Sequence, residues 1–227
     1  MIYFLPKIIN MRTKTTLCIS LSVSFVIVLS TIVTSCNKTP VVPIAVLNID
    51  SSKTVTAYDP TTNFSNYKTI ALTDSVSVAN GFSVSKELSK TDSAYLVALA
   101  SGIAGKGFTI VSKTAHPDLV LNITRIASTT DGLVDNSSYW SNYGMLYNPT
   151  VFGENGVSYS INFTTSQSVE DGVLSFELLD IKNASANNQI NIIWNGMISG
   201  YSLLSDISSV SIETGILFKK SPYLKAN

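Results

Sequence analysis

The stretch Val173–Ile198, VLSFELLDIKNASANNQINIIWNGMI, contains two apolar runs separated by a polar segment. In the first run apolar residues alternate with Ser175 and Glu177, which is the two-residue period of a strand. The polar segment predicts a hairpin loop, and Ile192 and Trp194 in the second run are expected to share the face that points into the core. The alternation also predicts that at least one face of the sheet meets water or a polar partner.

Other segments extend this pattern into a whole fold. Apolar residues three or four apart predict one helix that starts at Thr91–Asp92 and stops before Gly105 and Gly107, and a second between Ser205 and Pro222. Predicted strands, each bounded by turn residues, lie at Phe108–Val111, Leu119–Ile126, Tyr159–Thr165, Val173–Ile181 and Ile190–Ile198. We therefore expect an α+β fold, a mostly antiparallel sheet of five or more strands with two helices packed on one face.

The first 35 residues indicate export. Three basic residues precede the apolar run Leu17–Val33, which is the order found in a secretory signal peptide. The run is short and rich in serine for a retained transmembrane helix, which needs about 20 apolar residues. Translation from Met11 instead of Met1 would leave the same mature protein.

The last residue of this run and the three that follow it, Val33–Cys36 (VTSC), resemble the lipobox of bacterial lipoproteins. In that motif a peptidase cuts before the cysteine, here between Ser35 and Cys36, and the cysteine is acylated, for example with palmitate. Residues 1–35 are thus predicted to be a lipoprotein signal peptide, 36–51 a lipidated cysteine and tether, and 52–227 a single α+β domain. We expect the mature protein in the cell envelope, attached to the outer membrane through its lipid and facing the periplasm or the cell surface.

Charge and cysteine content argue against several functions. The chain has 15 Lys and Arg against 15 Asp and Glu, and removal of the three basic leader residues leaves 12 against 15. Nucleic acid is not an expected partner, because phosphate binding needs clustered cations and Arg125 is the only arginine after the leader. Cys18 falls in the leader and Cys36 would carry lipid, so neither a disulfide nor thiol chemistry is predicted.

No catalytic constellation, metal site or cofactor is predicted. His116 is the only histidine, and it has no serine elbow or cysteine to work with. One alternative stays open, in which Asp59, Asp118 or Asp180 meet in space as the paired carboxylates of a hydrolase. The residues around Asp59 more simply predict an Asx turn.

An aromatic segment is the main candidate for recognition. Tyr139, Trp140, Tyr143 and Tyr147 lie among asparagines and serines, and such rings suit contacts to a protein or a glycan. A long loop that folds its rings onto the sheet is the alternative. The leading hypothesis is a lipid-anchored, non-catalytic protein that binds another envelope component. A module that binds a glycan or lipid through residues 139–152 is the second hypothesis, and the hydrolase is the third.

Six blocks of sequence follow one another in a fixed order along the mature chain. They are YDPTTNFSNYKTIAL (Tyr58–Leu72), LVALASGIAGKGFTIV (Leu96–Val111), HPDLVLNI (His116–Ile123), GVLSFELLDIKN (Gly172–Asn183), NIIWNGMISG (Asn191–Gly200) and FKKSPY (Phe218–Tyr223). In this order they resemble the bacterial lipoproteins called domain of unknown function 4136, which are common in the Bacteroidetes envelope. The resemblance implies a compact α+β lipoprotein domain of unknown activity.

Overall fold

A computed structural model describes residues 53–80, 83–126, 133–143, 157–168, 172–200 and 207–227. All of these residues belong to one compact unit, Leu47–Asn227. The predicted leader, Ser35, Cys36 and the tether lie outside the described residues, as do Tyr147 and the rest of the aromatic segment beyond Tyr143.

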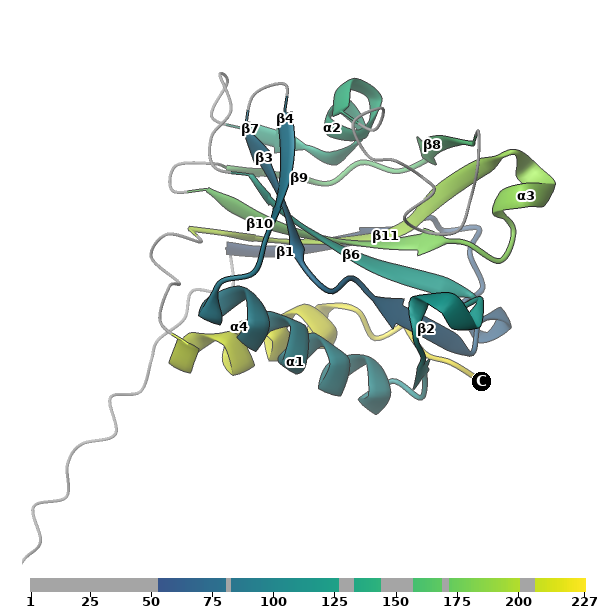
Figure 1. Cartoon of the computed structure of the whole chain (residues 1–227), viewed down its shortest axis with the longest axis horizontal. Helices are drawn as coiled ribbons and strands as arrows, with labels where there is room; N and C mark the ends of the chain where they lie inside the picture. Colours follow the sequence, from purple (N-terminus) through teal and green to yellow (C-terminus); the bar gives the residue numbers. More distant parts are fainter. Residues whose placement is uncertain (1–52, 81–82, 127–132, 144–156, 169–171, 201–206) are drawn as a thin grey trace, which may run out of the picture. The chain divides into compact units, whose positions relative to one another are not determined.

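In the described part of the chain, a nine-stranded mixed sheet forms the centre of the domain (Figure 1). Its strands are β1 (Thr54–Tyr58), β2 (Thr69–Leu72), β3 (Val76–Asn80), β4 (Ser83–Glu87), β5 (Thr109–Ile110), β6 (Leu119–Ile126), β8 (Ser158–Ile161), β10 (Val173–Asp180) and β11 (Gln189–Ser199). A two-stranded sheet pairs β7 (Leu133–Asp135) with β9 (Ser166–Ser168). The helices are α1 (Lys90–Gly105), α2 (Asn136–Tyr143), α3 (Ala184–Asn187) and α4 (Ile207–Lys220), with short 3₁₀ turns at Phe64–Asn66 and Lys113–Ala115. The predicted α+β class is confirmed.

The sheet is antiparallel at its centre and mixed toward its edges. β10 pairs antiparallel with β6 on one side and with β11 on the other. The outer edge of β6 is shared by β2 and β3, and both pairings are parallel. The outer edge of β11 is shared by β1, which is antiparallel, and β8, which is parallel. The sheet is thus mostly antiparallel, as predicted, but it also contains parallel pairs. The pairs of β2 and β3 with β6 are parallel because α1 forms a crossover between β2–β3 and β6, and a crossover returns the chain in the same direction.

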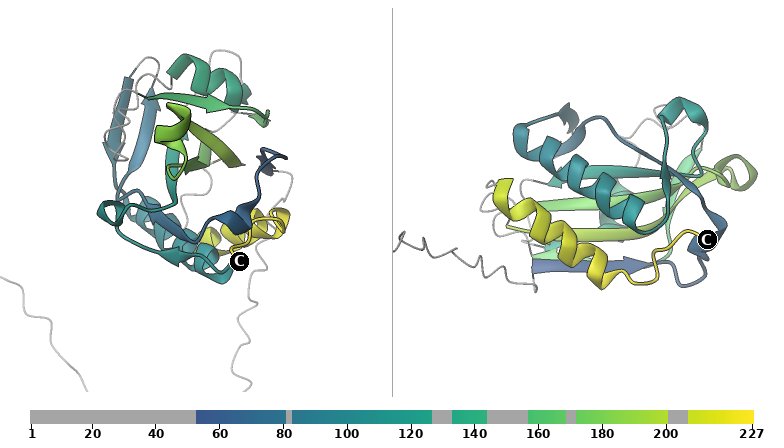
Figure 2. Two further views of the ribbon diagram at one scale, coloured as in Figure 1. Left: turned by 90° about the vertical axis from the view of Figure 1, so that its right-hand side faces the viewer. Right: turned by 90° about the horizontal axis from the view of Figure 1, so that it is seen from below.

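Helices α1 and α4 lie side by side on one face of the sheet, as predicted (Figure 2). α1 begins with a capping box, in which the Ser89 side chain accepts from the Asp92 N–H and the Asp92 carboxylate accepts from the Ser89 N–H. α2 was not predicted, and it covers the opposite face of the sheet (Figure 1). The sheet is therefore covered on both faces, by α1 and α4 on one and by a layer that includes α2 on the other.

Small residues of α1 allow α4 to approach closely. Ala94, Ala98 and Gly102 recur every four residues on the side of α1 that faces α4. A Cβ atom on Gly102 would lie 2.0 Å from the ring of Phe218 in α4, so this position has room for glycine alone. Lys106 then closes the helix pair, because its ammonium donates to the carbonyl oxygens of Phe218 and Ser221 at 3.0 Å each.

Strand β10 is buried on both faces, which corrects the expectation that its polar side meets water. Ser175 and Glu177 are 2% and 1% exposed, although they alternate with apolar residues as the sequence indicated. A second layer that includes α2 packs on this face through Tyr139 and Trp140. The polar residues of β10 therefore belong to the interior.

Ile192 and Trp194 do not share a face, contrary to the sequence prediction. A β-bulge between Leu178 and Leu179 shifts the register, so that Leu178 pairs with Trp194 and Leu179 with Ile192. Trp194 consequently packs in the helix-side core, and Ile192 packs with the opposite cluster.

Candidate functional site

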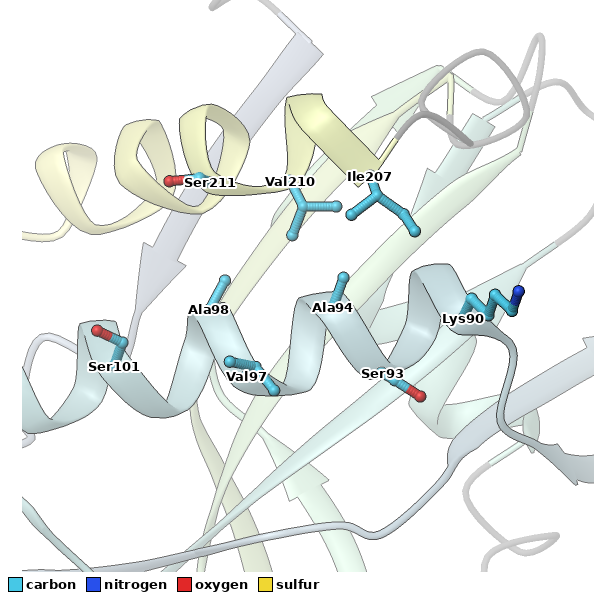
Figure 3. Close-up of a pocket in the computed structure, with 9 residues that line it drawn as sticks. All are labelled: Lys90, Ser93, Ala94, Val97, Ala98, Ser101, Ile207, Val210 and Ser211. Atoms are coloured by element: carbon cyan, nitrogen blue, oxygen red, sulfur yellow. The ribbon is translucent and has the colours of Figure 1, made fainter.

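An open groove of about 540 Å³ runs between residues 90–101 of α1 and residues 207–211 of α4 (Figure 3). Ala94 and Ala98 of α1 and Val210 of α4 line its inner part. Val97 and Ile207 stand at its rims and are 71% and 51% exposed. The groove is thus an apolar surface that the described residues leave open.

The sequence forms this groove by placing short side chains between bulkier ones. On α1 the groove-side residues follow one another every three or four positions, which is one helix face. The side chains along this face are alanine and serine except for Lys90 and Val97, so the two helix backbones are separated by little bulk. Ile207 is the first residue of α4, and no earlier turn of that helix covers it.

The exposed charges of the two helices are all positive. Their acidic residues, Asp92 and Glu213, are both 0% exposed. Asp92 pairs with Arg125 at 3.0 Å, and Glu213 accepts a hydrogen bond from the Thr54 hydroxyl at 3.2 Å. The exposed charged side chains of α1 and α4 are Lys90, Lys219 and Lys220. Lys90 lines the groove, whereas Lys219 and Lys220 lie at the other end of α4. An apolar groove on a helix pair whose exposed charges are positive favours a ligand that is apolar and anionic.

The opposite face of the sheet holds a buried carboxylate at its centre, Glu177. It accepts hydrogen bonds from the Asn122 amide at 2.9 Å, the Thr124 hydroxyl at 3.5 Å and the Ser175 hydroxyl at 2.5 Å. Burial raises the pKa of Glu177 to about 7, against the lowering effect of these three donors.

Asn195 completes this buried group from β11. Its amide donates to the Ser175 hydroxyl at 2.9 Å and to the Phe176 carbonyl at 3.1 Å. Its own carbonyl oxygen Oδ1 is buried and has no hydrogen-bond partner among the described residues. These side chains link β6, β10 and β11 by hydrogen bonds, which is the arrangement of a structural network. Within it, Asn195 Oδ1 is the acceptor that lacks a donor among the described residues.

The carboxylates proposed for a hydrolase are engaged in turns. Asp59 accepts hydrogen bonds from the N–H of Thr61 at 2.9 Å and from its hydroxyl at 2.6 Å, which is the predicted Asx turn. Asp118 accepts from the N–H groups of Lys68 and Thr69 at 2.6 and 3.1 Å. Partial burial alone would raise the pKa of Asp118, but these two donors, together with a nearby ammonium, hold it below its usual value.

Asp180 is also held by its neighbours. It accepts from the Tyr67 hydroxyl at 2.9 Å and from the Asn183 side-chain amide at 2.7 Å. Burial raises the pKa of Tyr67 well above its usual value, and the charge of Asp180 adds to this. Among the described residues no group of three His, Cys, Asp or Glu side chains could hold a metal ion. The arrangement gives the hydrolase hypothesis no support.

The aromatic candidates divide between the core and the undescribed part of the chain. Tyr139 and Trp140 are 7% and 4% exposed, and the Trp140 ring packs 5.0 Å from the ring of Tyr159. This burial agrees with the alternative in which the rings fold onto the sheet. The side chain of Tyr143, at the end of α2, and all of Tyr147 lie outside the described residues. A contact role for these four residues stays a prediction.

The comparisons with known proteins identify a family. Residues 54–223 match the family described as "Domain of unknown function (DUF4136)". The chain belongs to the DUF4136 family. The predicted resemblance is thereby confirmed, and it gives the chain a family whose function is unknown.

A solved structure of a DUF4136 protein agrees with this membership at the level of the fold. A DUF4136 family protein from Bacteroides thetaiotaomicron matches with a TM-score of 0.63 and 18% identity, covering 76% of this chain and 96% of that chain. A PDZ domain protein from Parabacteroides distasonis, at 16% identity, matches with a TM-score of 0.40 over 76% of this chain and 36% of its own. A dodecamer of a PelC variant from Paraburkholderia phytofirmans, at 12% identity, gives 0.36 over 77% and 97%. No curated protein matches the chain.

The sequence did not point to either the groove or the Glu177 network. The groove is lined by two segments that are more than 100 positions apart, so no local sequence pattern predicts it. The alternation in β10 did mark Glu177 as lying on the second face, but its partners Asn122 and Asn195 come from other strands.

In the described part of the chain no helix is long and apolar enough to cross a membrane.

Proposed function

We propose that this DUF4136 protein is a lipid-anchored, non-catalytic envelope protein that binds another envelope component through the α1–α4 groove. The observation that carries the binding role is the groove itself, whose rim residues Val97 and Ile207 are exposed together. Contiguous exposed apolar surface rimmed by polar residues marks interaction sites in soluble domains.

The carboxylates support binding over catalysis. Asp59, Asp118 and Asp180 each accept hydrogen bonds that hold turns or neighbouring segments, and Glu177 is enclosed by side chains of its own sheet. A catalytic carboxylate must reach a substrate atom. These four carboxylates are therefore engaged in hydrogen bonds within the domain.

The anchor is supported by the sequence alone. The apolar run Leu17–Val33 followed by VTSC predicts cleavage before Cys36 and acylation of its sulfur. Two or more acyl chains on one residue hold a protein firmly to a bilayer, whereas a single chain binds marginally. On this basis we place the protein at the outer membrane, facing the periplasm or the cell surface.

Two measurements on the native protein test the proposal. Intact mass spectrometry should find a chain that begins at an acylated Cys36. A photo-crosslinking residue at Val97 should form an adduct with one envelope component in living cells, and the same residue at Ala186 should not. Ala186 is the matched control because it is exposed and lies in α3, whose Ala184 packs in the cluster on the opposite face.

A second substitution links the adduct to the groove. Ile207→Asp places a charge on the opposite rim and should abolish the Val97 adduct. An unmodified Cys36 sulfur, or a Val97 position that forms no adduct, would overturn the proposal.

A further inference from the structure

We infer that the envelope component which covers the α1–α4 face is the anionic surface of a lipid bilayer. The inference rests on the proposed function, because it takes the lipid on Cys36 as the anchor. It differs from the anchor in that a second, reversible contact is made by side chains of the folded domain.

Exposed apolar side chains concentrate on this side of the described structure. Of its five exposed large hydrophobic residues, Val97, Ile207 and Ile212 lie on the two helices, and Leu88 comes two residues before α1. The fifth, Ile110, lies in β5. Single exposed hydrophobics are common on soluble proteins, but a concentration on one pair of helices is not. The apolar surface also extends past the groove, which suits a broad partner better than a single inserted side chain.

The charge of the helix pair complements an anionic surface. Lys90, Lys219 and Lys220 are exposed, whereas both acidic residues of α1 and α4 are fully buried. Lysine beside exposed aliphatic residues is the composition of helices that lie in the bilayer interface.

An exposed acid close to α1 already has a partner. Glu87, in β4, pairs with Arg125 at 3.2 Å. Asp206, the residue before α4, lies outside the described residues. A second copy of the chain fits the helical face less well than lipid does, because it would bring lysine-bearing helices together without exposed acidic residues on either helix.

The chain enters the described domain next to α4. The Thr54 hydroxyl donates to Glu213 at 3.2 Å, and the Lys220 ammonium donates to the Thr54 carbonyl at 2.6 Å. Cys36 precedes Lys53 by 17 residues, which span at most about 60 Å when fully extended. An acylated Cys36 would therefore keep the helical face within reach of the membrane, so that a weak contact is sufficient.

Two aligned helices give a broad surface for such a contact. Figure 2 shows α1 and α4 side by side beneath the sheet, and Figure 3 shows Lys90 and Ile207 at the same end of the groove. With the groove against lipid, Val97 and Ile207 would enter the headgroup and acyl boundary while the ammonium groups of Lys90 and Lys219 stay at the phosphates. The Lys220 ammonium is bound to the Thr54 carbonyl instead.

Depth-dependent fluorescence of the full lipidated protein tests the inference. Cys36 is acylated in that protein and no other cysteine follows the leader, so Val97→Cys, Ile207→Cys or Ala186→Cys supplies a single thiol for an environment-sensitive dye. Each labelled protein is reconstituted into vesicles of phosphatidylethanolamine and phosphatidylglycerol that contain a lipid-borne quencher. Vesicles of phosphatidylcholine alone provide the uncharged comparison.

The dye at residues 97 and 207 should shift to the blue and be quenched severalfold more strongly than the dye at residue 186. Its quenching should weaken severalfold in phosphatidylcholine, and also when Lys90→Glu and Lys219→Glu are combined. All five positions are exposed, and circular dichroism confirms that the variants are folded.

The outcomes separate this inference from the proposed function. Quenching at residue 97 no stronger than at residue 186 overturns the bilayer contact even when Cys36 is acylated. If the crosslinker at Val97 then captures a protein, the groove binds a protein and the proposed function stands. Quenching that is equal in charged and uncharged vesicles contradicts the anionic preference and so also overturns the inference as stated.

Discussion

The two faces of the central sheet are both buried, but they are covered by different structures and carry different chemistry. The helix-covered face is filled by apolar residues of β6, β10 and β11 together with long helices α1 and α4. The opposite face has the Glu177 network at its centre and shorter elements such as α2 above it. Each face contains one of the two tryptophans, Trp194 and Trp140. The comparison teaches that alternation along a strand predicts which residues share a face, whereas burial depends on what covers that face.

The largest effect should come from the tryptophans. Trp194→Ala removes a side chain in contact with the helix-side core and the hydrogen bond from its indole to the Ser221 hydroxyl at 3.0 Å. We expect a loss of about 3–5 kcal/mol in the free energy of unfolding. Trp140→Ala should cost less, because α2, which carries it, is a helix of only 8 residues. Urea unfolding followed by circular dichroism measures both. An equal or larger cost for Trp140→Ala would contradict the expectation that the helix-side core contributes more to stability.

Glu177→Gln tests the polar centre of the second face through pH. The pKa of Glu177 is raised from 4.5 to about 7 in the folded protein. Below pH 4.5 both states hold the proton, and between pH 4.5 and 7 the unfolded chain releases it first, so stability falls as pH rises. The total loss is about 3 kcal/mol at 1.36 kcal/mol per pKa unit.

Glutamine cannot ionise, so the variant should lack this decline. The difference in unfolding free energy between Glu177→Gln and the natural protein should move in the variant's favour from pH 4.5 to pH 8. Glu87→Gln, which removes an exposed carboxylate on β4, is the control for loss of charge. A difference that stays constant across this range would contradict a protonated Glu177 in the fold.

Two glycines of α1 test how tightly α1 packs against α4 on the helix-covered face. Gly102→Ala places a Cβ against the Phe218 ring and should cost about 1–3 kcal/mol through overpacking. Gly105→Ala meets nothing within 4 Å and should instead stabilise the helix by up to about 1 kcal/mol. The same thermal or urea unfolding measures both variants. Opposite signs are expected from one helix, and a neutral Gly102→Ala would mean that α4 shifts freely on α1.

The sequence was sufficient for the elements with strong periodicity. β6 was predicted with the bounds that the structure has, and β10 and β11 to within a residue at each end. α1 begins one residue before the predicted start, because Ser89 and Asp92 form the cap. These elements bury a regular apolar face, and such a face leaves a clear signal in sequence.

The remaining elements lack that signal. β1 to β4 are only four or five residues long, and β4 contains a single apolar residue, Val84, so their pairing depends on the strands beside them. The bulge at Leu178 inverted the face of Ile192, which no periodic pattern anticipates. The groove could not be predicted from the sequence either, because it depends on how α1 and α4, which are far apart in the chain, pack together.

The first described strand and the last helix hold each other in place. Besides the contacts of Thr54, the Thr56 hydroxyl donates to the Lys220 carbonyl at 3.3 Å. A chain that emerges with its N-terminus first would therefore have only α1 on the Trp194 side of the sheet until the 14 residues of α4 follow. Deletion of residues 207–227 would therefore remove half of the helical layer and, with it, the hydrogen-bond partners of Thr54 and Thr56 in β1. Loss of the C-terminal helix would thus also loosen the first described strand.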